Sequence, residues 1–222
     1  MSDLVAWAPD LLDGLRLTIL LTFTSMVLAL IIGLALALGR LSRRNALRWP
    51  AATFVEIIRG SPLLLQLFYI YYVFPFIGLK LPPLAAGILG LAINYGAYLS
   101  EVFRAGVLAV DRGQWEAADA LGVRHAYTMA LVVLPQAIRI VIPPVGNYFI
   151  SLFKDTALVS TISIADLIFR GQLIAADTFK YLQVYTIIFA LYLAISFPAS
   201  LGVRMLERRL RGPASGPRPG RR

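Results

Sequence analysis

The chain has 222 residues, of which 59% are hydrophobic and only 15% are Asp, Glu, Lys or Arg. Soluble domains average about 45–50% apolar and about 25% charged residues, so this composition excludes an ordinary soluble domain. The net charge of +9 gathers in residues 40–48 and 204–222, each just beyond an apolar run. Anionic lipid explains such flanking charge, and no nucleic-acid-binding motif accompanies it. The chain has no Cys, which excludes disulfides, Cys-bound metal and thiol catalysis.

Four uncharged runs of 23, 20, 20 and 23 residues are too long for the buried helices of a soluble protein. About 20 apolar residues at about 1.5 Å each cross a bilayer core of about 30 Å. We therefore expect an all-α membrane protein forming a single transmembrane domain over residues 1–211. The five expected spans lie near residues 17–39, 55–77, 83–102, 140–161 and 181–203.

The distribution of Lys and Arg predicts the orientation of these spans. Arg-rich segments follow the first and last spans, whereas the turn between the second and third carries only Lys80. Because cytoplasmic loops are the positively charged ones, the C-terminus is expected in the cytoplasm and the turn at Lys80 outside. Five spans then place the N-terminus outside, in agreement with its acidic start. That start lacks the positive charge of a signal peptide, so none is expected.

Two segments outside the spans have their own patterns. Residues 162–174 alternate apolar and polar at helical spacing and predict an interfacial helix on the outer face. Residues 212–222 are rich in Pro, Gly and Arg, and we expect a disordered basic tail there. No internal repeat is visible, which disfavours transporters built from inverted repeats.

The most informative motif lies in the expected cytoplasmic loop at residues 104–128. A short helix is expected to begin near Glu116, with acidic residues at its positive end, and to close at Gly122 in the left-handed conformation. Ala117 and Ala118 have so little bulk that another backbone can come close. The residues alone leave two interpretations open, a helix that docks on another protein or an amphipathic helix that rests on the membrane.

This loop resembles the EAA loop of ABC importer permeases. Glu116-Ala117-Ala118 is followed after three residues by Gly122 and after nine more by the block at 132–135, Val-Val-Leu-Pro, in which Val replaces the commoner Ile. Three other blocks match the polar amino acid branch of that family in order. They are Arg-Gly-Ser-Pro at 59–62, Tyr-Leu-Ser-Glu-Val-Phe-Arg-Ala-Gly at 98–106 and Lys-Asp-Thr-Ala-Leu-Val-Ser at 154–160. The resemblance covers about residues 12–210.

The resemblance implies a permease subunit of the bacterial cytoplasmic (inner) membrane that is itself no enzyme. Its implied partners are two cytoplasmic ATPase subunits, a second permease copy or close relative, and an external solute-binding protein. ATP and Mg²⁺ would be bound by the ATPase, and no cofactor or metal is expected in this chain. In that family the EAA helix docks into a groove on the ATPase and carries its closure to the membrane. The resemblance gives this coupling role to Glu116, Ala117, Ala118 and Gly122.

Polar residues at membrane depth suggest where a substrate passes. Asn147, Ser151 and Asp155 share one helical face, and a lipid-facing stripe of this kind is costly, so it is expected to line the bundle interior. The functional interpretation is a polar pathway in which Asp155 meets a substrate ammonium. Alternatively, Asp155 pairs with Lys154, or Lys154 reaches the interface by its own length.

Asn94 and Gln66 are weaker candidates for the same pathway, because a buried amide more often joins helices by hydrogen bonds. Glu101 and Arg104 are spaced for a salt bridge at the cytoplasmic mouth. The Arg-Gly-Ser-Pro block at 59–62 is interpreted as structural, a place where the second span loosens.

The favoured function is the import of a polar amino acid or related zwitterion, and a compatible solute or opine imported by the same mechanism is the alternative. The chain lacks the Gly-x-x-x-x-Gly-Lys-Ser/Thr loop, so a partner must hydrolyse ATP. A membrane enzyme would need a metal-binding His pair or a Gly-x-Ser-x-Gly turn, and the sequence has neither. An ATP-independent channel or carrier would have no use for the capped loop helix.

Overall fold

A computed structural model describes residues 2–211, with side chains described for residues 6–210. This part of the chain is mostly helical and has no strand, so the all-α prediction is confirmed. The helices are α1 (Ser2–Leu41), α2 (Asn45–Arg59), α3 (Leu63–Phe68), α4 (Pro83–Leu108), α5 (Arg112–Ala120), α6 (His125–Thr128), α7 (Leu134–Asp155), α8 (Leu167–Thr178) and α9 (Tyr181–Arg211). Two π-helical turns (Tyr69–Val73 and Met129–Val133) and two 3₁₀ segments (Phe74–Ile77 and Thr156–Ile162) join them. The tail expected at 212–222 lies outside the described residues.

Among the described residues, four continuous helical segments are long and apolar enough to cross a membrane. They are Ala6–Leu41, Pro83–Leu108, His125–Ile162 and Tyr181–Leu210. A fifth crossing requires α2 and the segment Leu63–Ile77 to count as one span, although the two are bent by 105°. The expected number of five is therefore reached only with one broken span.

The second span was predicted over residues 55–77 with a loosening at 59–62, and the structure shows a full break there. The chain breaks at Gly60, Ser61 and Pro62, between α2 and α3. Proline lacks the N–H that the helix needs and disfavours helical geometry in the residue before it. The carbonyl groups of Ile58 and Ser61 then need hydrogen-bond donors from outside the regular helix. The break is therefore polar within an otherwise apolar region.

The other helices extend beyond the predicted spans. α1 begins at Ser2 rather than near residue 17, and α4 continues to Leu108 rather than 102. The helix that contains the expected fourth span begins before residue 140, because α7 starts at Leu134 and continues from a π-helical turn. Hydropathy marks the apolar stretch that crosses lipid, whereas charged residues prolong a helix past the bilayer without breaking it.

α8 differs from the interfacial helix predicted at 162–174. It begins at Leu167, because Ser163 adopts a left-handed backbone and Asp166 caps the helix by accepting the Phe169 N–H at 2.9 Å. Its buried residues are Leu167, Gly171 and Ala175, which recur every four positions. This stripe packs against protein, since α8 contacts both α1 and α9. The helix is therefore part of the packed bundle, and its apolar stripe faces protein.

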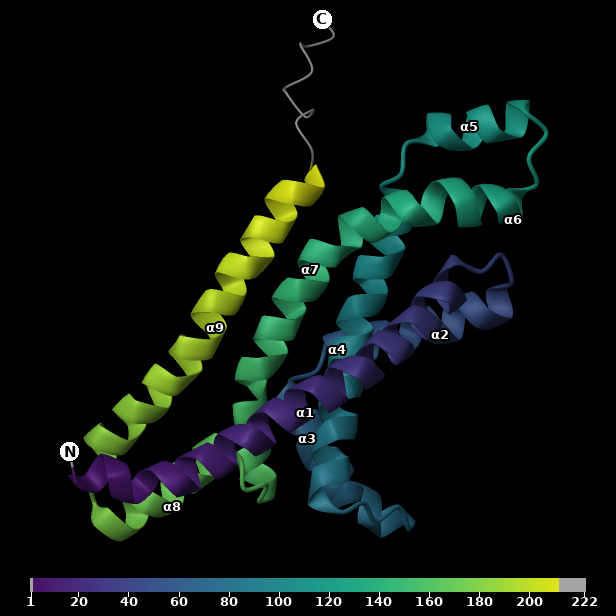
Figure 1. The fold of residues 1–222 in the computed structure, drawn as a ribbon. Coiled ribbons are helices and arrows are strands. Elements are labelled where there is room, and N and C mark those ends of the chain that lie inside the picture. Colours follow the sequence, from purple (N-terminus) through teal and green to yellow (C-terminus); the bar gives the residue numbers. More distant parts are fainter. Residues whose placement is uncertain (1, 212–222) are drawn as a thin grey trace, which may run out of the picture.

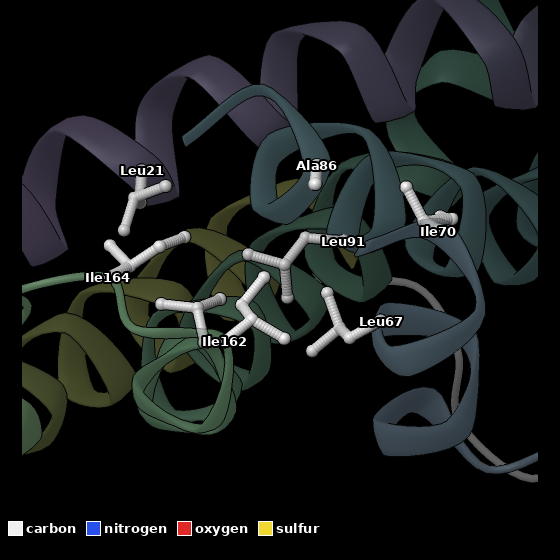
Figure 2. Packing of buried hydrophobic residues seen from close by; sticks show 8 residues of the cluster. Leu21, Leu67, Ile70, Ala86, Leu91, Ile162 and Ile164 are labelled. Atoms are coloured by element: carbon white, nitrogen blue, oxygen red, sulfur yellow. The ribbon is translucent and has the colours of Figure 1, made fainter. Parts of the chain in front are cut away.

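Interdigitated side chains and close backbone contacts hold the bundle together. One cluster joins α1, α3, α4 and the segment after α7, and Figure 2 shows Leu21, Leu67, Leu91, Ile162 and Ile164 converging in it. In lipid such contacts stabilise by packing, because water is already excluded. Small residues allow the closest approach.

The glycine contacts between α1 and α4 illustrate this approach. A Cβ built on Gly33 would lie 2.9 Å from the carbonyl oxygen of Gly96. α1 and α4 therefore cross at a distance that only glycine permits at this point.

The arrangement separates two ends of the molecule. α5 and α6 lie side by side at one end, towards which the C-terminal part of α9 also points (Figure 1). α8 and the N-terminal part of α1 lie at the opposite end, next to the start of α9 (Figure 1). The α2–α3 break and the middle of α4 and α7 lie between these ends, where the polar residues collect.

Candidate functional site

The α2–α3 break is stabilised by hydrogen bonds from the amide side chains of Gln66 and Asn94. The Gln66 Nε2 donates to the Ile58 carbonyl at 2.7 Å and to the Ser61 carbonyl at 3.1 Å. Asn94 on α4 donates in turn to the Gln66 Oε1 at 3.1 Å. The side chain of Gln66 thus satisfies carbonyls that the interrupted helix left free, as buried backbone in lipid requires. Gln66 acts as a brace and does not line the cavity beside it.

A cavity of about 450 Å³ opens next to this break, between α4 and α7. The volume falls within the usual range for small-molecule sites. Its walls are Arg59, Gly60, Ser61, Pro62, Leu63, Asn94, Tyr95, Tyr98, Tyr148, Ser151 and Asp155. This set combines three tyrosine rings with one cationic and one anionic side chain.

Asp155 is the anionic wall of the cavity. Its Oδ2 accepts a hydrogen bond from the Tyr95 hydroxyl at 2.7 Å, and Tyr95 is itself buried. Ser151 lies one turn away on α7 and lines the same cavity. Asn147, predicted to extend this stripe, is exposed and does not line the cavity. The predicted face therefore contributes two of its three members.

Lys154 lies beside Asp155 in sequence but faces elsewhere. Its side chain is exposed and lines a different cavity, together with residues of α8 and α9. Within the described part of the chain no ion pair joins Lys154 to Asp155. The carboxylate of Asp155 is thus left to the cavity and to Tyr95.

Arg59 is the cationic wall. Its guanidinium lies 5.4 Å from the centroid of the Tyr98 ring, a cation–π contact. The nearest carboxylate partner is Glu56, at 3.9 Å on the same helix, and this partner is 67% exposed. The Arg59 Nε is buried and finds no hydrogen-bond partner among the described residues. No ion pair links Arg59 to Asp155 in this part of the chain, so the cavity has two opposite charges that do not neutralise each other directly.

A second charged cluster lies further along α4. Glu101 pairs with Arg104, which confirms the predicted salt bridge, and its Oε2 also meets Arg40 of α1 at 2.6 Å. Arg40 donates to the Ser100 hydroxyl at 3.4 Å as well. The exposed fraction of the Arg40 side chain is 11%. One carboxylate shared by two guanidiniums therefore ties the end of α1 to α4.

The loop helix α5 is capped at both ends. Asp111 caps its start by accepting the Gly113 N–H at 2.7 Å, so α5 begins at Arg112 and not near Glu116 as predicted. At the other end Gly122 has a φ of +71°, as predicted. The Gly122 N–H bonds to the Asp119 carbonyl and the Val123 N–H to that of Ala118, both at 3.0 Å. These two bonds form the pair by which glycine commonly closes a helix.

α5 presents two different faces. Trp115 stacks on His125 with ring centroids 4.9 Å apart, and Ala118 is only 7% exposed, so both belong to the face turned towards α6. Glu116 and Ala117 lie on the exposed face, next to Leu121 with 81% of its surface exposed. The prediction treated Ala117 and Ala118 as equivalent. The structure separates them, because Ala118 packs against its own chain.

Three cavity residues escaped the sequence reasoning in whole or in part. Arg59 was interpreted as structural, and Tyr95 and Tyr148 were not singled out. The available signal was on α4, where Tyr95 directly follows Asn94 and Tyr98 lies one turn further on. Nothing in the spacing of α7 relates Tyr148 to that turn, since only tertiary packing brings the rings within 6.2 and 5.8 Å.

Comparison with known proteins places these features in a wider group. Residues 15–212 match the family described as the binding-protein-dependent transport system inner membrane component. The chain is 43% identical over 203 residues to the L-cystine transport system permease protein TcyB of Bacillus subtilis, covering 91% of this chain and 87% of that protein. It is 35% identical over 205 residues to the glutamine transport system permease protein GlnP of Escherichia coli, covering 91% and 94%.

Solved structures agree with these sequence relationships. A crystal structure of an amino acid ABC transporter with histidines contains a chain that is 40% identical, with a TM-score of 0.90 over 93% of this chain and 97% of that one. A chain of the MetNI methionine ABC transporter, solved in an inward-facing conformation, has a TM-score of 0.69 over 95% and 99%. Its identity is 19%, so this second likeness concerns the fold alone.

Proposed function

Because the chain belongs to the family of inner membrane components of binding-protein-dependent transport systems, we propose that it imports polar amino acids as the permease subunit of an ATP-driven transporter. Members of this family are multi-pass inner membrane proteins without catalytic activity of their own, and a separate ATPase hydrolyses ATP. The observation that carries the substrate class is the cavity lined by two opposite charges, Arg59 and Asp155, that do not pair with each other.

The two charges are complementary to the main-chain groups of a free amino acid. Asp155 accepts hydrogen bonds, so it suits the α-ammonium, and the guanidinium of Arg59 suits the α-carboxylate. Tyr95 holds the Asp155 carboxylate in place, which reduces the conformational freedom lost on binding. The relatives named for L-cystine and glutamine transport support this class. An opine carries an additional carboxylate, for which the described cavity walls offer no second cation.

Asn94 and Ser151 supply the neutral polar groups of the cavity. The Asn94 amide already donates to Gln66, which leaves its own oxygen as an acceptor towards the cavity. Ser151 can donate or accept at the α7 wall. We assign these two residues to the side chain of the substrate and Gln66 to the support of Asn94. Asn147 has an exposed side chain outside the cavity and is assigned to the pathway beyond it.

Coupling to ATP is assigned to α5. Its exposed face, Glu116, Ala117 and Leu121, combines a charge, a small residue and a large apolar side chain, a combination that suits insertion into a groove of another protein. Gly122 fixes the direction in which Leu121 projects, and Ala118 anchors the helix on its own loop. The positive-inside rule puts this end of the molecule in the cytoplasm, where the ATPase is.

The complete transporter is proposed to contain two copies of the permease or a copy and a close relative, two ATPase subunits that hold ATP and Mg²⁺, and an external binding protein. ATP drives transport only if the docked helix interacts differently with the open and closed ATPase dimers. The chain itself binds substrate and transmits motion.

Reconstitution tests this function directly. The permease, its ATPase and the binding protein are incorporated in or added to proteoliposomes, and uptake of radiolabelled cystine, glutamine, arginine and histidine is measured. We expect accumulation of at least one of them that requires both ATP and the binding protein. Uptake that proceeds equally without ATP would instead identify a channel or carrier. ATP-driven uptake of a compatible solute or opine, but of no amino acid, would support the alternative substrate class.

A further inference from the structure

A second cavity lies next to the cavity lined by Arg59 and Asp155, and only a few side chains separate the two. This second cavity of about 310 Å³ lies between α4 and α7, one to three turns closer to α5. It is lined by Arg59, Tyr98, Glu101, Val102, Ala105, Gly106, Ala109, Ile140, Pro144 and Tyr148. Arg59, Tyr98 and Tyr148 line both cavities. A side chain that lines two adjacent cavities forms the wall between them.

The three side chains of this wall also contact one another. The Arg59 guanidinium lies over the Tyr98 ring, at 5.4 Å from its centroid. The Tyr98 and Tyr148 rings are 5.8 Å apart with an interplanar angle of 32°. The wall therefore runs from the end of α2, across α4, to α7. It lies between the cavity that contains Asp155 and the second cavity.

Arg59 is the least firmly anchored member of the wall. Among the described residues it forms one ion pair, with Glu56 at 3.9 Å, which joins residues of the same helix and is largely exposed to solvent. Glu101 lines the second cavity, but its carboxylate already pairs with Arg40 and Arg104. The guanidinium of Arg59 therefore contacts Tyr98 instead. Arg59 is moreover the last residue of α2, directly before the 105° bend. A change in that bend moves Arg59 relative to α4.

We propose that Arg59, Tyr98 and Tyr148 form a gate beneath the substrate cavity, and that a change in the α2–α3 bend opens it by withdrawing Arg59 from Tyr98. This inference deepens the proposed function and depends on it, because the gate has a purpose only if a substrate crosses from the Asp155 cavity to the cytoplasmic side. It assigns transport roles to two tyrosines and to the hinge at Gly60–Pro62, separate from substrate recognition.

Thiol accessibility can test this gate, since the chain contains no Cys that would react in the background. Ser151→Cys places a thiol in the substrate cavity beside Asp155, and Ala105→Cys places one in the second cavity. Each variant is assembled with its ATPase, without nucleotide, in inside-out vesicles that present the cytoplasmic face. The membrane-impermeant reagent MTSET is added, and its rate of attachment to this chain is followed by the mass shift.

The gate predicts that Ser151→Cys reacts slowly and Ala105→Cys rapidly. Adding Tyr98→Ala is expected to accelerate the reaction of Ser151→Cys about tenfold or more, equivalent to removing a closing free energy of ~1.4 kcal/mol. Tyr98→Phe keeps the ring that closes the wall, so the rate is expected to stay low. The rate at Ala105→Cys should be the same in all three backgrounds, which controls for a general loosening of the bundle.

Two outcomes would overturn the gate. One is rapid labelling of Ser151→Cys with Tyr98 intact, and the other is an unchanged rate with Tyr98→Ala in a complex that still contains its ATPase. If Tyr98→Ala does not assemble, Tyr148→Ala removes the opposite ring and makes the same prediction. ATP-driven uptake by the unmodified complex is measured in parallel. If the unmodified complex takes up an amino acid but Ser151→Cys is labelled rapidly with Tyr98 intact, only the gate is rejected. If the complex takes up no amino acid, the proposed function is rejected.

Discussion

Asp155→Asn isolates the charge that the proposed amino acid site depends on. The amide has the same shape as the carboxylate, and its oxygen can still accept the Tyr95 hydroxyl that lies 2.7 Å from Asp155. What disappears is the negative charge opposite the substrate ammonium. A hydrogen bond to a charged group contributes about 1.5–3 kcal/mol. At ~1.4 kcal/mol per factor of ten, the substrate Kd should rise about 12- to 140-fold.

The measurement is equilibrium binding of the radiolabelled amino acid to the purified permease–ATPase complex without the binding protein. The binding protein must be left out because its own affinity would otherwise dominate the apparent KM of uptake. Lys154→Gln serves as the matched control, since this neighbour also loses one charge but faces away from the cavity. It should bind as the wild type does.

Tyr95→Phe complements this pair of variants. It removes the hydroxyl that orients Asp155 but keeps the charge, so the loss should be smaller, about 0.5–1.5 kcal/mol or 2- to 12-fold in Kd. An Asp155→Asn complex that binds substrate with the wild-type Kd would refute the ammonium site. Equal losses in Asp155→Asn and Lys154→Gln would show that a general disturbance of this segment, and not the loss of a direct contact, lowers the affinity.

Three further predictions concern coupling, pH and packing. Gly122→Asp should abolish substrate-stimulated ATP hydrolysis, because a side chain strains the left-handed turn that orients Leu121. Membrane insertion should stay intact, because a Cβ at this position meets no atom within 4 Å. Import at the wild-type rate by an assembled Gly122→Asp complex would contradict the coupling role. Burial raises the pKa of Asp166, outside the spans, to about 7, so stability from this group is greatest at low pH and is lost as the pH rises through 7. Asp166→Asn keeps the cap and should therefore raise the Tm of the purified complex more at pH 8.5 than at pH 5.5, because the cost of the carboxyl accumulates between its unfolded pKa of about 4 and its folded pKa of about 7. An equal effect at both pH values would argue against a charged carboxylate. Gly33→Ala should destabilise by about 1–3 kcal/mol, measured as a lower Tm, because the new methyl meets the α4 backbone; Gly202→Ala, with open space around it, is the control.

The sequence predicted those parts of the fold that depend on local chemistry. Long uncharged runs located the apolar spans, and Gly122 located the end of α5, because only glycine enters a left-handed turn without strain. The start of α5 was placed too late because Asp111 was not considered as a cap. The 105° bend was foreseen only as a loosening at Pro62, since the direction of a broken helix depends on what packs around it.

The candidate site was predictable in part for the same reason. Asp155 and Ser151 were found because charge and polarity at membrane depth are costly and therefore informative. Asn147 shares their helical face, but its distance from the α2–α3 break decides that it lies outside the cavity. Arg59 was overlooked as a wall residue because its place opposite α4 comes from the bend, and sequence spacing contains no information about that bend.

A cryo-EM structure of the assembled transporter with a transported amino acid bound tests the central claim most directly. We predict density for the substrate in the cavity beside the α2–α3 break, with its ammonium within hydrogen-bonding distance of Asp155 and its carboxylate towards Arg59. The exposed face of α5 should be seated on the ATPase in the same map. An empty cavity in a map that shows the substrate elsewhere in the membrane domain, or α5 surrounded by solvent, would contradict this proposal.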